Sequence, residues 1–226
     1  VTFTNKAAQE MRERLDAGFG RRQGAKAMAI GTFHSLCLHL LTQAQEPPVV
    51  IDEDAALCLA KETIEETGLS LTPKKLLDAV SKTKNGVSNA KLKETLPDQA
   101  FSLYCNKLRQ HGVVDFDDLL LMVLELLESD TPMNRKPFTY LFVDEFQDIN
   151  PLQYRLLRAW AQQSKGLFVI GDPDQSIYGF RGSDTHCFSW LMEDYPALRQ
   201  IRLQTNYRST PQILHCALPV LTGSKG

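Results

Sequence analysis

Leu-Phe-Val-Asp-Glu-Phe-Gln-Asp, residues 141–148, is the stretch that decides the fold of this chain. Its first three residues form a short apolar run bounded by charge, which is typical of a buried strand in a parallel sheet. Asp144, Glu145 and Asp148 then lie at or just beyond the carboxyl end of that strand. Ligands of open α/β sheets bind at this edge, where one carboxylate can hold Mg²⁺ on a nucleotide and its neighbour can activate a water. A solvated acidic turn after a strand is equally compatible with the spacing alone.

A second apolar run, residues 167–172, ends in another polar segment, residues 172–182. Gln175 in that segment can hydrogen-bond a terminal phosphate. Tyr178 and Phe180 offer flat faces on which nucleic-acid bases can stack, with Arg181 beside them. The alternative for each ring is a surface turn in which the ring packs inward.

Apolar runs that alternate with helical patterns predict a parallel, doubly wound sheet flanked by helices. We expect further strands over residues 1–4, 27–32 and 199–203. Residues 49–112 differ, because they are rich in Lys and Glu, follow helical patterns and contain no strand-like run. This stretch is predicted to be an inserted, all-helical subdomain. In it, Asp52 can cap a helix that ends at Gly68, Pro73 opens another, and Lys82 and Lys84 are more typical of a solvated face than of a phosphate site.

Other polar groups are predicted where strands give way to helices. Thr32 and His34 lie at one such junction, where they can contact a sugar-phosphate backbone, and Phe3 and Asn5 lie at another. The segment 206–209 precedes the last helix, and an Arg there can reach phosphate charge. Each of these groups taken singly is more often structural than functional.

Composition limits the function classes only weakly. The 226 residues are 43% hydrophobic and 23% charged, with a net charge of −2, so any nucleic-acid surface must be local. The five cysteines are scattered, show no metal-ligand spacing with the histidines, and suit reduced thiols in a cytosol. No apolar stretch reaches the roughly 18 residues of a membrane span. We therefore expect a cytoplasmic protein without a membrane partner.

Five segments in order resemble motifs Ia, Ib, II, III and IV of the UvrD/Rep/PcrA family of superfamily 1 DNA helicases. They are residues 2–8, 31–35, 143–148, 171–182 and 206–209, and residues 115–120 also resemble the family's pattern ahead of motif II. The resemblance implies an α/β fold with a RecA-like parallel sheet. It divides the chain into a first part of the motor domain (1–46), a helical insertion (47–112), a second part of the motor domain (113–205) and the start of a second motor domain (206–226).

The family implies an ATP-driven motor that moves 3′ to 5′ on single-stranded DNA and unwinds duplex DNA, in DNA repair or replication. Carried over by position, Asp144 would hold Mg²⁺, Glu145 would activate the hydrolytic water and Gln175 would sense the γ-phosphate. Arg208 would be an arginine finger, Tyr207 would stack on adenine, and Gln147 and Asp148 would couple the two sites. The residues implied to line the single-strand path are Phe3, Asn5, Thr32, His34, Tyr178, Phe180 and Arg181.

The sequence also departs from the family. No loop of the type Gly-x-x-x-x-Gly-Lys-Thr, which cradles phosphates with backbone N–H groups and a Lys, occurs in these residues. We therefore expect a fragment with little ATPase activity, existing as a monomer or a weakly self-associating species. Two alternatives stay open: the helicase part of a RecB/AddA-type helicase–nuclease, and a catalytically inactive single-stranded-DNA-binding module.

Overall fold

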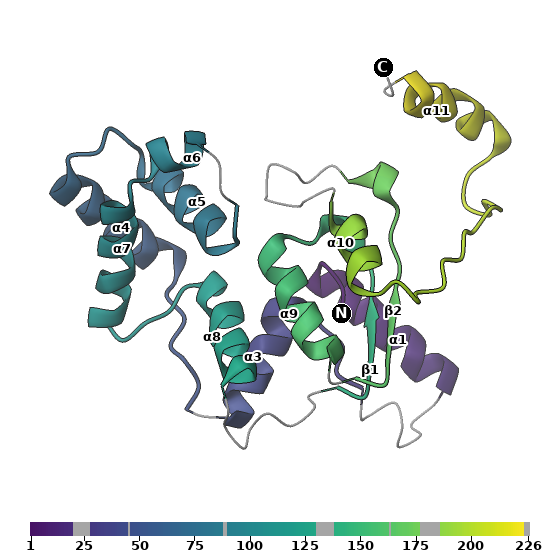
Figure 1. Cartoon of the computed structure of the whole chain (residues 1–226), viewed down its shortest axis with the longest axis horizontal. Helices are drawn as coiled ribbons and strands as arrows, with labels where there is room; N and C mark the ends of the chain where they lie inside the picture. Colours follow the sequence, from purple (N-terminus) through teal and green to yellow (C-terminus); the bar gives the residue numbers. More distant parts are fainter. Residues whose placement is uncertain are drawn as a thin grey trace.

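Two short parallel strands form the sheet that the structure shows. The structure is a computed structural model that describes residues 1–19, 28–44, 46–87, 90–129, 138–162, 164–176 and 186–223. Strand β1 (Tyr140–Val143) pairs with β2 (Gly166–Val169) in a register that runs from Tyr140↔Gly166 to Val143↔Val169. Helix α9 (Pro151–Gln162) connects them, which makes the βαβ unit expected from the apolar runs (Figure 1). The chain is thus an α/β protein with a small parallel sheet.

The start of the chain lies against the free edge of β1 without forming a strand. The N–H of Asp144 donates to the carbonyl of Val1 at 3.0 Å, and the N–H of Thr2 donates to the carbonyl of Gly31 at 3.0 Å. Backbone around residue 31, residues 1–2, β1 and β2 therefore lie side by side in that order. The strands predicted over residues 1–4 and 27–32 are not formed in the described residues, which leave out residue 27. Residues 1–2 instead make single backbone hydrogen bonds to residue 31 and to the edge of β1, where the Val1 amino group also donates to the carbonyl of Phe142 at 2.6 Å.

Five helices in the described parts of the chain complete the α/β body. They are α1 (Asn5–Phe19), α3 (Phe33–Ala44), α8 (Phe116–Glu128), α9 and α10 (Cys187–Asp194). The apolar stripes of all but α1 meet the inward face of the sheet, so that α9's Trp160 is fully buried and stacks on Phe33 at 5.8 Å. This packing holds the helix starts and the strand ends in fixed relative positions.

A second group of helices has a hydrophobic core of its own. It comprises α4 (Glu53–Thr67), α5 (Pro73–Lys84), α6 (Ala90–Thr95) and α7 (Asp98–Gln110), called the helical lobe below (Figure 1). Asp52 caps α4 through the N–H of Ala55, and Gly68 ends it in a left-handed conformation, as the sequence predicts. A parallel bridge between Val50 and Val114 closes the neck of the lobe. The boundaries at 47 and 112 stay a prediction.

The last part of the chain leaves the body. Residues 199–203 form no strand, which corrects the prediction, and Leu203 is 92% exposed. Helix α11 (Pro211–Gly223) follows and projects away from the sheet (Figure 1). An alternating segment becomes a strand only where a neighbouring strand supplies hydrogen bonds. In the described structure β2 pairs with β1, and residues 199–203 add no strand beside them.

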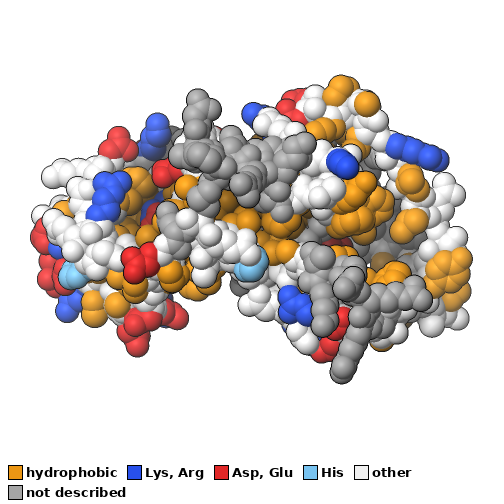
Figure 2. All heavy atoms as spheres, turned by 90° about the horizontal axis from the view of Figure 1, so that it is seen from below, with side chains coloured by type: hydrophobic (Ala, Val, Ile, Leu, Met, Phe, Trp, Pro, Cys, Tyr) orange, Lys and Arg blue, Asp and Glu red, His pale blue; other side chains and the backbone are white. Residues whose placement is uncertain are grey.

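The outer face of the sheet corrects a second expectation, because the strands were expected to be buried on both sides. Leu141 and Val143 point into the core, whereas Phe142 and Phe168 are 62% and 52% exposed, with ring centres 5.8 Å apart. Figure 2 likewise shows hydrophobic side chains at the surface of the body. Among the described helices, none is long and apolar enough to cross a membrane.

Candidate functional site

The acidic turn, residues 144–148, follows β1 directly. Asp144 is half-buried and Glu145 is exposed, while Gln147 and Asp148 are buried. Glu145 has φ 52° and ψ 43°, and it is the only non-glycine residue with positive φ in the described parts of the chain. A left-handed conformation costs a side-chain-bearing residue about 1–2 kcal/mol. Such strain, where it persists, is a common property of functional sites.

Gln147 ties this turn to the end of β2. Its Nε2 donates to Glu145 Oε2 at 2.7 Å, and its Oε1 accepts from the N–H of Asp172 at 3.0 Å. Asp172 Oδ2 in turn accepts from Gln175 Nε2 at 2.7 Å. A continuous chain of hydrogen bonds thus connects Glu145 with Gln175. The two residues predicted to act on one triphosphate lie at the same edge of the sheet.

Gly171 makes this connection possible. A Cβ atom at Gly171 would lie 2.8 Å from Gln147 Oε1 and 3.1 Å from Phe146 Cβ. The backbone of the two strands also stays paired here, because the N–H of Phe146 donates to the carbonyl of Ile170 at 3.0 Å. Sequence reasoning missed both Gly171 and Asp172 as positioning residues, although both lie in the segment it singled out.

Asp148 is a buried carboxylate with an unsatisfied atom. Asp148 is 8% exposed, and its Oδ1 atom has no hydrogen-bond partner among the described residues. Burial, and then the charge of Glu145, raise the pKa of Asp148 above the ordinary value of 3.8. A buried acid with one unpaired oxygen atom, beside a strained turn, marks this edge as a candidate site rather than a plain surface loop.

The second group of predicted residues lies where α1 and α3 begin. The Thr4 hydroxyl accepts from the N–H of Ala7 at 3.1 Å, and the Thr32 hydroxyl accepts from the N–H of Ser35 at 3.3 Å, so each threonine caps one helix. The Thr2–Gly31 backbone bond brings these two helix starts together. A hollow of about 650 Å³ between the helices is lined by residues that include Asn5 and Ser35.

His34 lies on α3 with its ring edge-on to Phe116, the two ring centres 6.0 Å apart. Burial lowers the pKa of His34, and the charge of Asp117 offsets this only in part. The imidazole is therefore neutral near pH 7 and can act as a hydrogen-bonding group, not as a cation. Phe3, also predicted for this surface, is half-buried at the start of the same region.

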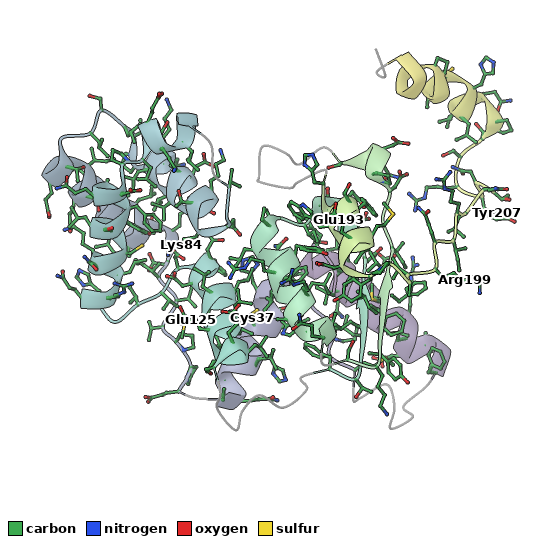
Figure 3. The ribbon with its side chains drawn as sticks, in the orientation of Figure 1. Cys37, Lys84, Glu125, Glu193, Arg199 and Tyr207 are labelled. Atoms are coloured by element: carbon green, nitrogen blue, oxygen red, sulfur yellow. The ribbon has the colours of Figure 1, made fainter. Side chains whose placement is uncertain are left out.

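The structure does not bring two predicted residues to the acids. Tyr207 is 94% exposed and lies far from the sheet (Figure 3), and Arg208 beside it is exposed too. The Asn206 side chain accepts from the N–H groups of Arg208 and Ser209 and so shapes the turn before α11. Tyr178, Phe180 and Arg181 lie outside the described residues. The roles of all five stay predictions.

The acids do not form a metal centre from protein ligands alone. In the described ranges, no group of three or more His, Cys, Asp or Glu side chains lies close enough together to hold an ion. Mg²⁺ on a nucleotide needs only one or two carboxylates, because phosphates and water complete its octahedron. Asp144 at the end of β1, beside Glu145, fits a cation of that kind.

Fold and site together define an α/β protein whose polar side chains converge where parallel strands end. The family model described as UvrD/REP helicase N-terminal domain matches residues 1–196, and the chain belongs to this family. It is 35% identical to the ATP-dependent DNA helicase PcrA of Leuconostoc citreum and 34% identical to that of Bacillus subtilis. Both matches cover 98% of this chain, which spans only 32% of the length of either relative.

Replacement of Gly171 by Ala tests the close approach of the two strand ends. We expect a loss of about 1–3 kcal/mol in the free energy of unfolding, because the new methyl group meets Gln147 and Phe146. Gly18→Ala is the matched control, since no atom lies within 4 Å of a Cβ there. Gly18 lies in the last turn of α1, where the preference for Ala over Gly is weaker than in the interior, so this control should change stability by less than about 0.5 kcal/mol. Equal effects of the two changes in urea unfolding would contradict the proposed packing.

Asp148→Asn tests the unpaired carboxylate. The raised pKa means that the folded chain binds this proton more readily than the unfolded chain, so the charged form destabilises the fold at neutral pH. The penalty disappears as the pH falls through the raised pKa toward 3.8. We expect the variant to be more stable by about 1 kcal/mol at neutral pH, with the difference shrinking in acid.

The measurement is the free energy of unfolding in urea at neutral pH and at a pH near the ordinary Asp pKa. Asp174→Asn, at an exposed position on the neighbouring loop, is the control and should change stability little at either pH. A variant Asp148→Asn that is less stable than the parent at neutral pH would show that the carboxylate is satisfied.

Proposed function

We propose that this chain is the larger part of a RecA-like motor domain of an ATP-dependent DNA helicase that moves 3′ to 5′ on single-stranded DNA. The observation that carries the proposal is the hydrogen-bonded chain from Glu145 through Gln147 and Asp172 to Gln175, in a member of the UvrD/REP helicase family. The related PcrA proteins are described as ATP-dependent DNA helicases, which agrees with this assignment. A role in DNA repair or replication belongs to the same proposal.

In the proposed mechanism, each polar group at the strand ends has one task. Asp144 would hold Mg²⁺, which supplies charge neutralisation of the nucleotide phosphates when it is bound. Glu145 is exposed at the turn and would accept a proton from the attacking water. Gln175 would hydrogen-bond a terminal phosphate. Its bond to Asp172 would couple that contact to Gln147 and the acidic turn. Arg208 and Tyr207 would add a guanidinium and a stacking face on closure.

Single-stranded DNA would run over the starts of α1 and α3. Phe3, Asn5, Thr32 and His34 would contact it there, followed by Tyr178, Phe180 and Arg181. Two capped helix starts present backbone N–H groups and the positive ends of helix dipoles, which attract phosphate. The net charge of −2 gives no global attraction, so the affinity must come from this local surface. A monomer or a weakly self-associating species belongs to the same proposal.

ATP hydrolysis by these residues alone should stay at background. The 226 residues contain no Gly-Lys-Thr loop to hold the β- and γ-phosphates, so Glu145 has no positioned substrate. The measurement is multiple-turnover phosphate release with Mg²⁺, ATP and oligo(dT). Turnover that Glu145→Gln abolishes would show that the chain is an active ATPase and would refute this expectation.

Binding of a fluorescent oligo(dT) to this chain tests the proposed DNA surface. We expect His34→Ala to weaken binding by roughly tenfold, the cost of one good contact in a nucleic-acid interface. Because the imidazole is neutral near pH 7, the slope of log affinity against log salt should not change. His111→Ala, at an exposed position at the end of α7, is the control. Absence of binding, or equal loss in both variants, would contradict the assigned surface.

A further inference from the structure

Two adjacent polar residues at the end of α5 are buried where the helical lobe meets the body. Lys84 and Asn85 are 8% and 6% exposed. Lys84 Nζ lies 2.7 Å from Asp115 Oδ2 and 2.6 Å from Asp118 Oδ1, at the start of α8. Figure 3 shows Lys84 between the lobe and α8. A buried Lys with two carboxylates fixes the position of α5 against α8.

Asn85 extends this contact to a third element. Its Nδ2 donates to Asp117 Oδ1 at 2.7 Å, and its Oδ1 accepts from Asn150 Nδ2 at 2.7 Å. Asn150 comes two residues after Asp148 and lies directly before the first residue of α9. It exchanges hydrogen bonds with Gln153, whose N–H donates to Asn150 Oδ1 at 2.9 Å and whose Oε1 accepts from the N–H of Asn150 at 3.1 Å. Asn85 therefore reaches the segment that carries the acidic turn.

The same cluster touches the proposed DNA surface. Asp117, which binds Asn85, is the charge that acts on His34, and Phe116 beside it packs its ring against His34. Asn85 thus binds two residues: Asp117, which lies next to the proposed DNA surface, and Asn150, which lies next to the acidic turn. We call Lys84, Asn85, Asp117 and Asn150, with the two acids that bind Lys84, the junction.

The charges of the junction favour a fixed arrangement. Burial alone would lower the pKa of Lys84, but Asp115 and Asp118 outweigh burial and raise it, so the ammonium stays charged. Burial raises the pKa of Asp115 in spite of Lys84. Buried ion pairs contribute little net stability compared with apolar packing, yet they are directional. Directional bonds of this kind fix the angle between α5 and α8.

We propose that Asn85 is a positioning residue that couples the helical lobe and the starts of α3 and α8 to the acidic turn through Asn150. This rests on the proposed function in one respect, namely that nucleic acid is the ligand whose binding the junction transmits. A force on the lobe or on His34 moves Asp117 and Asn85, and Asn85 moves Asn150 and hence the backbone of residues 145–150. Coupling of this kind can be carried by a contiguous set of packed and hydrogen-bonded contacts, and the junction supplies such a set between Asp117 and Asn150.

The first arm of the test uses this chain without ligands. Asn85→Ala should raise amide hydrogen exchange in residues 145–153 by about fivefold, the effect of one net hydrogen bond on local opening, while leaving the core of the lobe unchanged. Asn106→Ala is the matched control, because the Asn106 side chain binds Arg109 within α7 of the lobe. Exchange in 145–153 that does not change, or that rises equally throughout the chain, would overturn the proposal.

A double-mutant cycle guards against a merely structural effect. Asn150→Ala alone should also raise the exchange rate in residues 145–153. In the double variant with Asn85→Ala, the rate should rise by less than the product of the two single increases, because both changes remove the same hydrogen bond. Effects that multiply would mean that the two side chains act independently and that Asn85 does not act through Asn150.

The second arm adds oligo(dT) to the same variants. In the parent chain, the oligonucleotide should slow exchange both at the start of α3 and in residues 145–150. In Asn85→Ala it should still protect α3 but no longer protect 145–150. Protection of 145–150 that persists in the variant would overturn the coupling. An oligonucleotide that binds nowhere would refute the proposed function, whereas the first arm would still decide whether Asn85 positions the turn.

Discussion

The rest of the site depends on one side-chain amide, that of Gln147. Its two ends bind Glu145 and the backbone of Asp172, so it joins the loops that leave two neighbouring strands. Parallel strands bring their carboxyl ends to one edge, but they do not by themselves hold the following loops in register. The amide does so, and it can approach only because residue 171 has no side chain. Backbone hydrogen bonds flank the left-handed Glu145: the N–H of Phe146 donates to the carbonyl of Ile170 at 3.0 Å, and the N–H of Asp148 donates to the carbonyl of Glu145 at 3.0 Å.

A second constraint concerns the helical lobe, which is attached by few but directional contacts. The lobe has its own core around Leu76, Tyr104 and Leu108, so its internal stability does not depend on the body. Its orientation depends instead on the neck at Val50 and Val114 and on the ion pairs of Lys84. Apolar contacts tolerate sliding, whereas charged hydrogen bonds fix distance and direction. The directional bonds of Lys84 therefore fix the angle at which the lobe meets α8.

Local patterns in the sequence predicted much of the framework. Asp52, Gly68 and Pro73 mark helix ends because capping is a contact between near neighbours. Lys84 shows why the junction escaped prediction: with Lys82 it resembles a solvated basic pair. Lys82 does pair with Asp78 one turn away, but the acids that bind Lys84 lie 31 and 34 residues further along. Helical periodicity carries no information about such distant partners.

The sheet shows the same limit from another side. Alternation predicts which residues of β1 and β2 share a face, and Leu141 and Val143 do share the buried one, but it cannot say whether the other face is covered. The exposure of Phe142 and Phe168 depends on elements beyond the strand itself. Ordered motifs likewise placed Glu145 and Gln175 at one edge, because both follow paired strands.

Arg208 and Tyr207 obey a different physical rule from the acids. They follow residues 198–206, an extended and exposed segment, so few packing contacts hold them in their present position. Moving them to the sheet edge would therefore cost mainly chain entropy, which grows slowly with loop length, and would break little packing. A ligand that contacts both the acids and the guanidinium would supply the differential binding energy that such a closure requires. The fold prearranges the acids and Gln175, whereas in the proposed function the guanidinium would have to be recruited, and this difference would make closure depend on the ligand.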